Sequence, residues 1–154
     1  MKSFRTALPP YQAPFQLTHA DPLLLAGSCF TEHIGRRLAE GKFHTLLNPN
    51  GILYNPVSVA RSLEAPPLRL FQSENDGLYY SWDHHGVFAD ADRAALVENI
   101  VQNQQGIAAF LQKTNYLFVT LGTARVFSLK EDGLVVANNH KAPAGRFEER
   151  RLGV

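Results

Sequence analysis

Two largely apolar runs stand out in the pattern of hydrophobic and polar positions along the chain. The first covers residues 23–26 and the second covers residues 116–121. Runs without polar alternation are typical of strands that are buried on both faces, as in a parallel sheet. The pattern therefore predicts a core that contains at least two buried parallel strands.

Three other segments have the spacing of helices. Phe30, Ile34 and Leu38 lie four residues apart, which predicts a helix over about residues 30–40 that ends near Gly41. A second helix is expected from Pro56, with Asn55 as its cap. It ends before the prolines at 66–67.

The third predicted helix, over residues 93–113, is the longest stretch of the chain with helical periodicity. Asp90 or Asp92 is expected to cap its N-terminus. Its interior contains Gly106, but the period continues past it. The apolar positions are Leu96, Val97, Ile100, Val101, Ile107, Ala108 and Leu111.

The remaining segments predict shorter elements. Residues 42–47 form a short strand candidate, and residues 68–88 a strand or hairpin capped by a loop. Asp132-Gly133 between two β-like runs indicates a hairpin. Residues 138–154 look like the beginning of a helix.

This order of elements predicts an α/β fold, a three-layer sandwich with a mostly parallel sheet and helices on both faces. We expect two regions: a proline-rich extended arm over residues 1–22, which packs on the domain, and the domain itself over residues 23–154. The domain looks incomplete at its C-terminal end, because no strand follows the last predicted helix.

Composition narrows the possible partners. The formal net charge is +1 and no basic run occurs, so nucleic acid is not an expected partner. No apolar stretch approaches the ~20 residues that cross a bilayer, and the start has no apolar signal region. We therefore expect no membrane contact and a cytoplasmic location. Cys29 is the only cysteine, which rules out an internal disulfide.

Candidate chemistry lies at the turn after the first apolar run, where Ser28 and Cys29 follow Gly27. Ligands of open α/β sheets bind outside the carboxyl ends of the strands. The N-terminus of the following helix would stabilise a thiolate or an oxyanion. Two simpler interpretations stay open: Ser28 caps the helix, and Cys29 is a small buried apolar residue.

The run Gly27-Ser28-Cys29-Phe30 after a first apolar strand resembles the signature of the GSCFA family, within the SGNH/GDSL hydrolases. Similar segments cover most of the chain: Asn48–Pro56, Trp82–His85 and Tyr116–Phe127. The resemblance implies an SGNH/flavodoxin-like fold. It also implies hydrolysis or transfer of an acyl group from a small-molecule or carbohydrate ester, with no cofactor.

The resemblance also assigns roles to residues. Cys29 lies where the serine nucleophile of the G-D-S-L motif would be, and Ser28 where its aspartate would be. Gly51 matches the glycine of the second motif, although a turn glycine with positive φ fits it too. Ala124 replaces the asparagine of the third motif, so Thr123 or Arg125 would have to supply the missing donor. The oxyanion- or substrate-binding set is expected to be Gly51, Asn55, His85, Gly122, Thr123 and Asn138.

The general base is the least defined part of this prediction. The D-x-x-H sequence that supplies it in SGNH enzymes is absent from these 154 residues. His140 lies in a segment that resembles the family's N-C-H-K, so His140 or His85 is expected to line the pocket. Loop histidines bonded to the backbone are the alternative. We expect little or no turnover by this chain alone.

Other classes of site have weaker support. A zinc site formed by Cys29, His85 and His140 lacks short-range ligand spacing, and no P-loop or G-x-G-x-x-G sequence occurs. No metal and no cofactor is predicted. Two alternatives to an enzyme remain: a non-catalytic module that binds an anion or a sugar on the same fold, and a fragment that folds poorly by itself.

Overall fold

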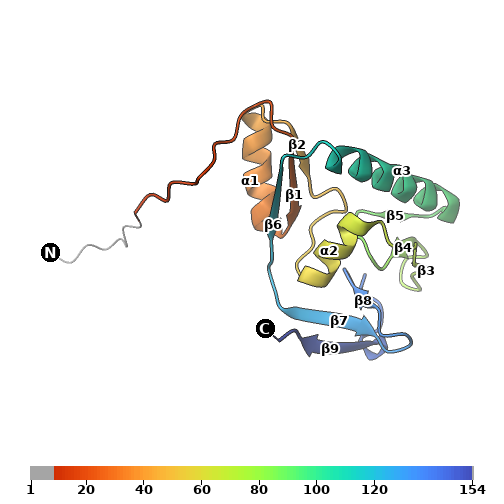
Figure 1. Ribbon diagram of the computed structural model, residues 1–154. Helices are drawn as coiled ribbons and strands as arrows, with labels where there is room; N and C mark the ends of the chain where they lie inside the picture. Colours follow the sequence, from red (N-terminus) through yellow and green to blue (C-terminus); the bar gives the residue numbers. More distant parts are fainter. Residues whose placement is uncertain (1–8, 154) are drawn as a thin grey trace.

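The computed structural model describes residues 9–153 and shows a mixed α/β fold (Figure 1). Its helices are α1 (Cys29–Glu40), α2 (Pro56–Glu64) and α3 (Arg93–Leu111), and a short 3-10 turn covers Ala144–Arg146. The strands are β1 (Leu23–Gly27), β2 (Thr45–Leu47), β3 (Leu70–Gln72), β4 (Tyr79–Ser81), β5 (Ala89–Asp90), β6 (Tyr116–Thr120), β7 (Arg125–Leu129), β8 (Val135–Val136) and β9 (Phe147–Arg151).

A parallel sheet in the order β2-β1-β6 forms the centre of the fold. All five residues of β1 are buried, because α1 contacts the sheet from one side and the cluster on the other includes side chains of α2 and of the end of α3. In that cluster Leu24 packs with Val59 and Leu111. The prediction of a buried parallel strand is confirmed for β1.

Strand β6 differs from the prediction of a run buried on both faces. Leu117 and Val119 are exposed, as is Leu121 directly after the strand. In the register with β1, Leu117 lies opposite Leu24, so the exposed side chains continue the sheet face that α2 and α3 cover over β1. Strand β6 is at the edge of the sheet, where these helices do not reach.

Helix α1 presents an unexpected face to the sheet. Its buried residues are Thr31 and Gly35, whereas Phe30 and Ile34 of the apolar stripe are exposed. A Cβ atom added to Gly35 would lie 2.4 Å from Cδ1 of Leu47. Small side chains therefore bring α1 close to the sheet, and the bulkier apolar residues of the helix point elsewhere.

The other six strands form two small antiparallel sheets, β3-β4-β5 and β8-β7-β9. The first packs on α3 through a cluster that contains Phe88, Leu96 and Ile100. The second encloses Trp82 and Leu129. Both predicted hairpins are confirmed, but they form sheets separate from the parallel one.

Two predicted helix caps are confirmed. Oδ1 of Asn55 accepts a hydrogen bond from the N–H of Ser58 at 2.8 Å, at the start of α2. Oδ1 of Asp92 accepts one from the N–H of Ala94 at 2.8 Å, at the start of α3.

The predicted terminal helix is wrong. Residues 147–151 form β9, which pairs antiparallel with β7. Phe147 at its start is buried against Trp82 and Leu129, and the charged residues that follow are exposed. The local sequence Glu-Glu-Arg-Arg suits a helix, but pairing with the free edge of β7 and burial of Phe147 decide for a strand.

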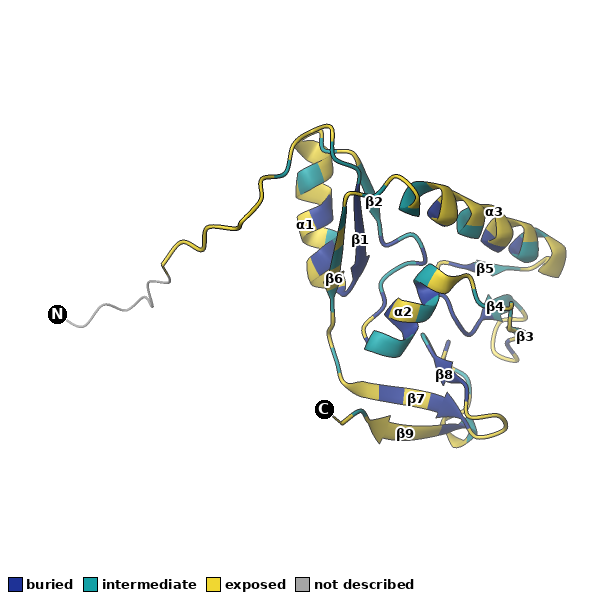
Figure 2. Cartoon of the chain, in the orientation of Figure 1, coloured by how far each residue is buried: buried dark blue, intermediate teal, exposed yellow. Residues whose placement is uncertain are grey.

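Residues 9–20 precede the sheet and are mostly exposed (Figure 2). Phe15 stacks on Tyr116 with a ring-centroid distance of 5.1 Å, and His19 stacks on Phe43. The first eight residues of the predicted arm lie outside the described part. Within residues 9–153, no helix has both the length and the apolar composition that a membrane span requires.

Candidate functional site

The turn between β1 and α1 is built around a glycine that no other residue could replace. Gly27 has φ +143°, and a Cβ atom there would lie 2.1 Å from the carbonyl oxygen of Thr120 on β6. The N–H of Gly27 donates to Oδ1 of Asn48 at 2.9 Å. The turn is thereby held against the carboxyl end of β6.

Ser28 occupies the N-cap position of α1 without making the cap hydrogen bond. Its Oγ instead lies 2.8 Å from Oγ1 of Thr120, which also bonds the hydroxyl of Thr31. Ser28 is 7% exposed, whereas Cys29, the first residue of α1, is exposed. Ser28 therefore holds the cap position without capping through its side chain. The interpretation of Cys29 as a buried apolar residue is wrong, and Cys29 is the accessible member of the pair.

The backbone N–H groups expected to bind an oxyanion already have partners. Gly51 donates to the carbonyl of Asn48 at 2.7 Å, and both Gly122 and Thr123 donate to the carbonyl of Tyr54. Gly51 also has φ +78° and lies against His85, as a turn glycine should. These three groups act as turn-forming donors in this structure.

A cleft of about 580 Å³ lies beside this turn. Gly122 connects the two, since a Cβ atom there would lie 3.5 Å from Cβ of Ser28 and 2.7 Å from Cδ1 of Tyr54, a residue of the cleft. The predicted residues that line the cleft are Asn55, His85, Thr123 and Asn138, and the others are Ile52, Tyr54, Arg125, Phe127, Val136, Ala137 and Asn139.

Several polar side chains of the cleft already have partners in the protein. Both ends of the Asn55 amide bond Ser58, and Oδ1 of Asn138 accepts from the N–H of His140. Nδ1 of His85 accepts from the N–H of Val87 at 3.3 Å, so Nε2 carries the proton in the neutral ring. The cleft thus offers fixed amides and one imidazole N–H beside apolar walls.

Sequence reasoning missed Tyr54 and Asn139, and it named Arg125 only as a replacement for the missing donor of the third motif. Tyr54 lies within the segment Asn48–Pro56 that resembles the family, which was a usable signal. Arg125 enters the cleft from β7 and pairs with Glu149 on β9 at 2.9 Å. That pairing depends on the strand that the sequence did not predict.

His140 lies outside this cleft. It is 8% exposed and packs against the rings of Phe71, Tyr80 and Trp82. Its Nε2 lies 2.9 Å from the carbonyl oxygen of Ser81. Burial lowers the pKa of His140, and the bond to Ser81 opposes this only in part.

His84, the neighbour of His85, is completely enclosed. Its Nδ1 lies 2.7 Å from Oγ of Ser81, and its Nε2 has no partner among the described residues. Burial lowers its pKa to about 4, with a smaller opposing effect of Asp83. Of the two adjacent histidines, only His85 lines the cleft.

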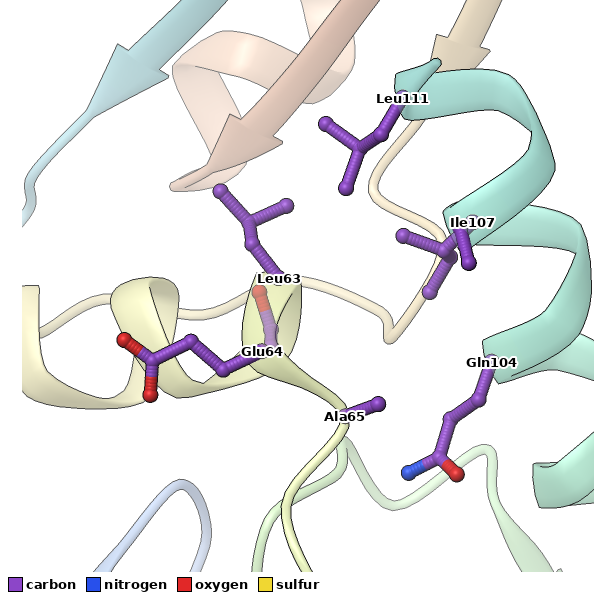
Figure 3. Close-up of a pocket in the computed structure, with 8 residues that line it drawn as sticks. Leu63, Glu64, Ala65, Gln104, Ile107 and Leu111 are labelled. Carbon is purple, nitrogen blue, oxygen red and sulfur yellow. The ribbon is translucent and has the colours of Figure 1, made fainter.

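A separate hollow of about 290 Å³ lies between α2 and α3 (Figure 3). Leu63, Ile107 and Leu111 supply its apolar lining, with Glu64 and Gln104 at its sides. It contains none of the predicted site residues. Within residues 9–153, no group of three or more His, Cys, Asp or Glu side chains has the arrangement of a metal site.

The sequence model of the GSCFA family matches residues 22–154. The chain belongs to the GSCFA family. The matched region includes all the strands and helices described above. Neither the curated proteins nor the solved structures gave a match. The GSCFA signature itself, Gly27 to Phe30, forms the turn and the first residues of α1.

Proposed function

We propose that this GSCFA protein carries the nucleophile-bearing part of an acyl-ester hydrolase or acyltransferase on an SGNH-like three-layer fold. The observation that supports this most directly is the exposed Cys29 at the first position of α1, after the central strand of a parallel sheet. This is the position where open α/β sheets place reactive groups. A cytoplasmic location belongs to the same proposal.

The chemistry follows from the environment of the thiol. Cys29 lies at the N-terminus of α1, where the helix dipole favours negative charge that develops on a reacting group, and the first-turn N–H groups of α1 receive no side-chain cap. In the proposed step, Sγ of Cys29 forms a bond to the acyl carbon and the ester C–O bond breaks. The alcohol leaves with a proton from solvent. Water or a second alcohol then releases the acyl group from sulfur.

The cleft beside the turn would hold the rest of the substrate. Its amide, phenol and imidazole groups lie beside the apolar side chains of Ile52, Phe127 and Val136. Such a mixture suits an acyl chain at one end and a hydroxyl-bearing group at the other.

A non-catalytic binding module is the second candidate. It is favoured by the three engaged N–H groups of Gly51, Gly122 and Thr123, which leave the oxyanion without its expected donors. The cleft alone could then bind a sugar or an anion.

Acylation of Cys29 separates the two functions. The protein would be incubated with p-nitrophenyl acetate, quenched in acid and digested, and the acetyl group located by mass spectrometry. We expect a thioester on Cys29 that forms at least about tenfold faster than in the urea-unfolded chain, and that is absent from Cys29→Ala. Equal rates in the folded and unfolded chains would contradict the enzymatic proposal.

A matched control is Ser28→Ala, which removes the buried hydroxyl and keeps the thiol. Labelling of Cys29 in this variant is expected to persist. Transfer of the acyl group to Ser28 in the wild-type protein would instead make the serine the nucleophile.

A further inference from the structure

A second, smaller cleft of about 210 Å³ lies next to the large one. The two clefts share Asn138 and Asn139 as a common wall. Apart from Gly86, every residue that lines the smaller cleft has a polar group in its side chain. The lining residues are Asn75, Asp76, Tyr80, Gly86, Asn138, Asn139, His140 and Lys141.

The imidazole of His140 is fixed in one tautomer at this cleft. Its Nε2 lies 2.9 Å from the carbonyl oxygen of Ser81. A carbonyl oxygen can only accept, so Nε2 carries the proton and Nδ1 is left with a lone pair. Because burial lowers the pKa of His140, the ring stays neutral near pH 7.

The lone pair of Nδ1 faces the cleft without a partner. Among the described residues, the side chain of His140 forms a hydrogen bond through Nε2 and none through Nδ1. A Cβ atom added to Gly86 would lie 3.8 Å from Nδ1 and 4.0 Å from Nδ2 of Asn138. The absence of a side chain at Gly86 therefore keeps this acceptor and this amide open to a ligand.

The loop that carries His140 is held in a strained conformation. His140 and Lys141 both have positive φ, 48° and 58°, which costs energy for residues with a Cβ. Oδ1 of Asn138 holds the N–H of His140 at 2.8 Å, and Nδ2 of Asn75 donates to the carbonyl of Lys141 at 3.0 Å. Both tethers come from residues of the cleft, so its walls fix the imidazole in place.

The charges at the cleft indicate what it can bind. A ligand must donate an O–H or N–H to Nδ1 of His140. Asp76, whose pKa is lowered first of all by a hydrogen bond from the backbone of Leu78, keeps a negative charge there and disfavours anions. Lys141 disfavours cations. A neutral group with several hydroxyls meets both conditions.

We propose that the smaller cleft binds a sugar, with one hydroxyl donating to Nδ1 of His140 and another bonding the amide of Asn138. This extends the proposed function by naming the hydroxyl-bearing part of the substrate. Only the statement that the bound sugar is part of the substrate rests on the proposed function. The binding itself does not require Cys29.

The test uses the Cys29→Ala protein, so that binding is measured without acylation. Methyl glycosides of glucose, galactose and N-acetylglucosamine would be titrated while the ring nitrogens of His140 are followed by ¹H–¹⁵N NMR. We expect at least one glycoside to shift Nδ1 saturably, with Nε2 still protonated. No saturable shift with any of the three up to about 100 mM, far above a millimolar Kd, would overturn the proposal.

Two variants show whether the sugar lies in this cleft. Gly86→Leu fills the space in front of Nδ1 and leaves the bond between His140 and Ser81 intact. It is expected to weaken binding at least tenfold. Gly106→Leu is the matched control, because Gly106 lies on α3 with no atom near its Cβ position, and its binding should equal that of the parent.

Unchanged binding in Gly86→Leu would place the sugar elsewhere and overturn the proposal. Inorganic phosphate is the competing probe: saturation of the Nδ1 signal by phosphate, with no response to the glycosides, would also overturn it. If Cys29 of the wild-type protein is not acylated but the sugar still binds, only the enzymatic proposal is refuted.

Discussion

His84 shows how burial sets the charge of a single residue. Its side chain is 1% exposed, and desolvation is the largest cause of its pKa falling to about 4. Asp83 beside it raises the pKa and His140 lowers it further, but neither reverses the effect of burial. His84 is therefore neutral in the folded protein over a pH range where it is charged in the unfolded chain.

This difference predicts a loss of stability in mild acid. Between pH 6.5 and about 4 the unfolded chain binds a proton at His84 that the folded protein does not. The free energy of unfolding should therefore decrease as the pH is lowered through this range, by up to about 3 kcal/mol from this residue. His140, whose pKa is also lowered, adds to the fall.

Urea unfolding measured from pH 7 to pH 5 would check this, since the carboxylates with lowered pKa titrate below that range. His84→Asn keeps an amide near Oγ of Ser81 and should flatten the dependence. His33→Asn, at an exposed position of α1, should leave it unchanged. An equal slope in His84→Asn and the wild type would contradict the assignment.

At the scale of one element, α1 and α3 use glycine in opposite ways. Gly35 of α1 is buried against the side chain of Leu47, which lies 2.4 Å from its Cβ position. Gly106 of α3 is exposed and has no atom within 4 Å of its Cβ position. The first glycine permits close packing of helix and sheet, and the second serves no packing role.

The same substitution should therefore change stability in opposite directions. Gly106→Ala is expected to raise the free energy of unfolding by about 0.5–1 kcal/mol, because alanine has the higher helix propensity. Gly35→Ala is expected to lower it by about 1–3 kcal/mol, because the methyl group displaces Leu47. Urea unfolding at pH 7 measures both. Stabilisation by Gly35→Ala would show that Leu47 moves aside without cost.

At the scale of the whole molecule, the parallel sheet has one apolar edge. No described strand pairs with the outer edge of β6, and Leu117, Val119 and Leu121 are exposed there. An unpaired strand edge with apolar side chains is a site for association with another chain.

We expect this protein to self-associate as its concentration rises. Sedimentation velocity should show the effect, and Val119→Lys should reduce it by placing a charge on the edge. Val87→Lys is the control, since Val87 is exposed but lies in the turn before β5 and not on β6. Association that persists unchanged in Val119→Lys would place the contact on another surface.

Local sequence determined the elements whose signals are local. The apolar run before Gly27 predicted β1, Asn55-Pro56 predicted the start of α2, and Asp132-Gly133 predicted the β7–β8 hairpin. Each depends on side chains that act on their own backbone or on near neighbours. The GSCFA signature was also readable, because it is a continuous run at one turn.

Only the tertiary structure decided which residues meet. Strand β6 stays partly exposed because the helices do not reach the edge of the sheet. Strand β9 forms because it can pair with the free edge of β7 and because Phe147 packs against Trp82. Long-range contacts also place the carbonyl of Tyr54 where it accepts hydrogen bonds from the N–H groups of Gly122 and Thr123. They separated His85 in the large cleft from His140 in the small one, because packing between distant segments, which no local pattern encodes, sets the direction of each side chain.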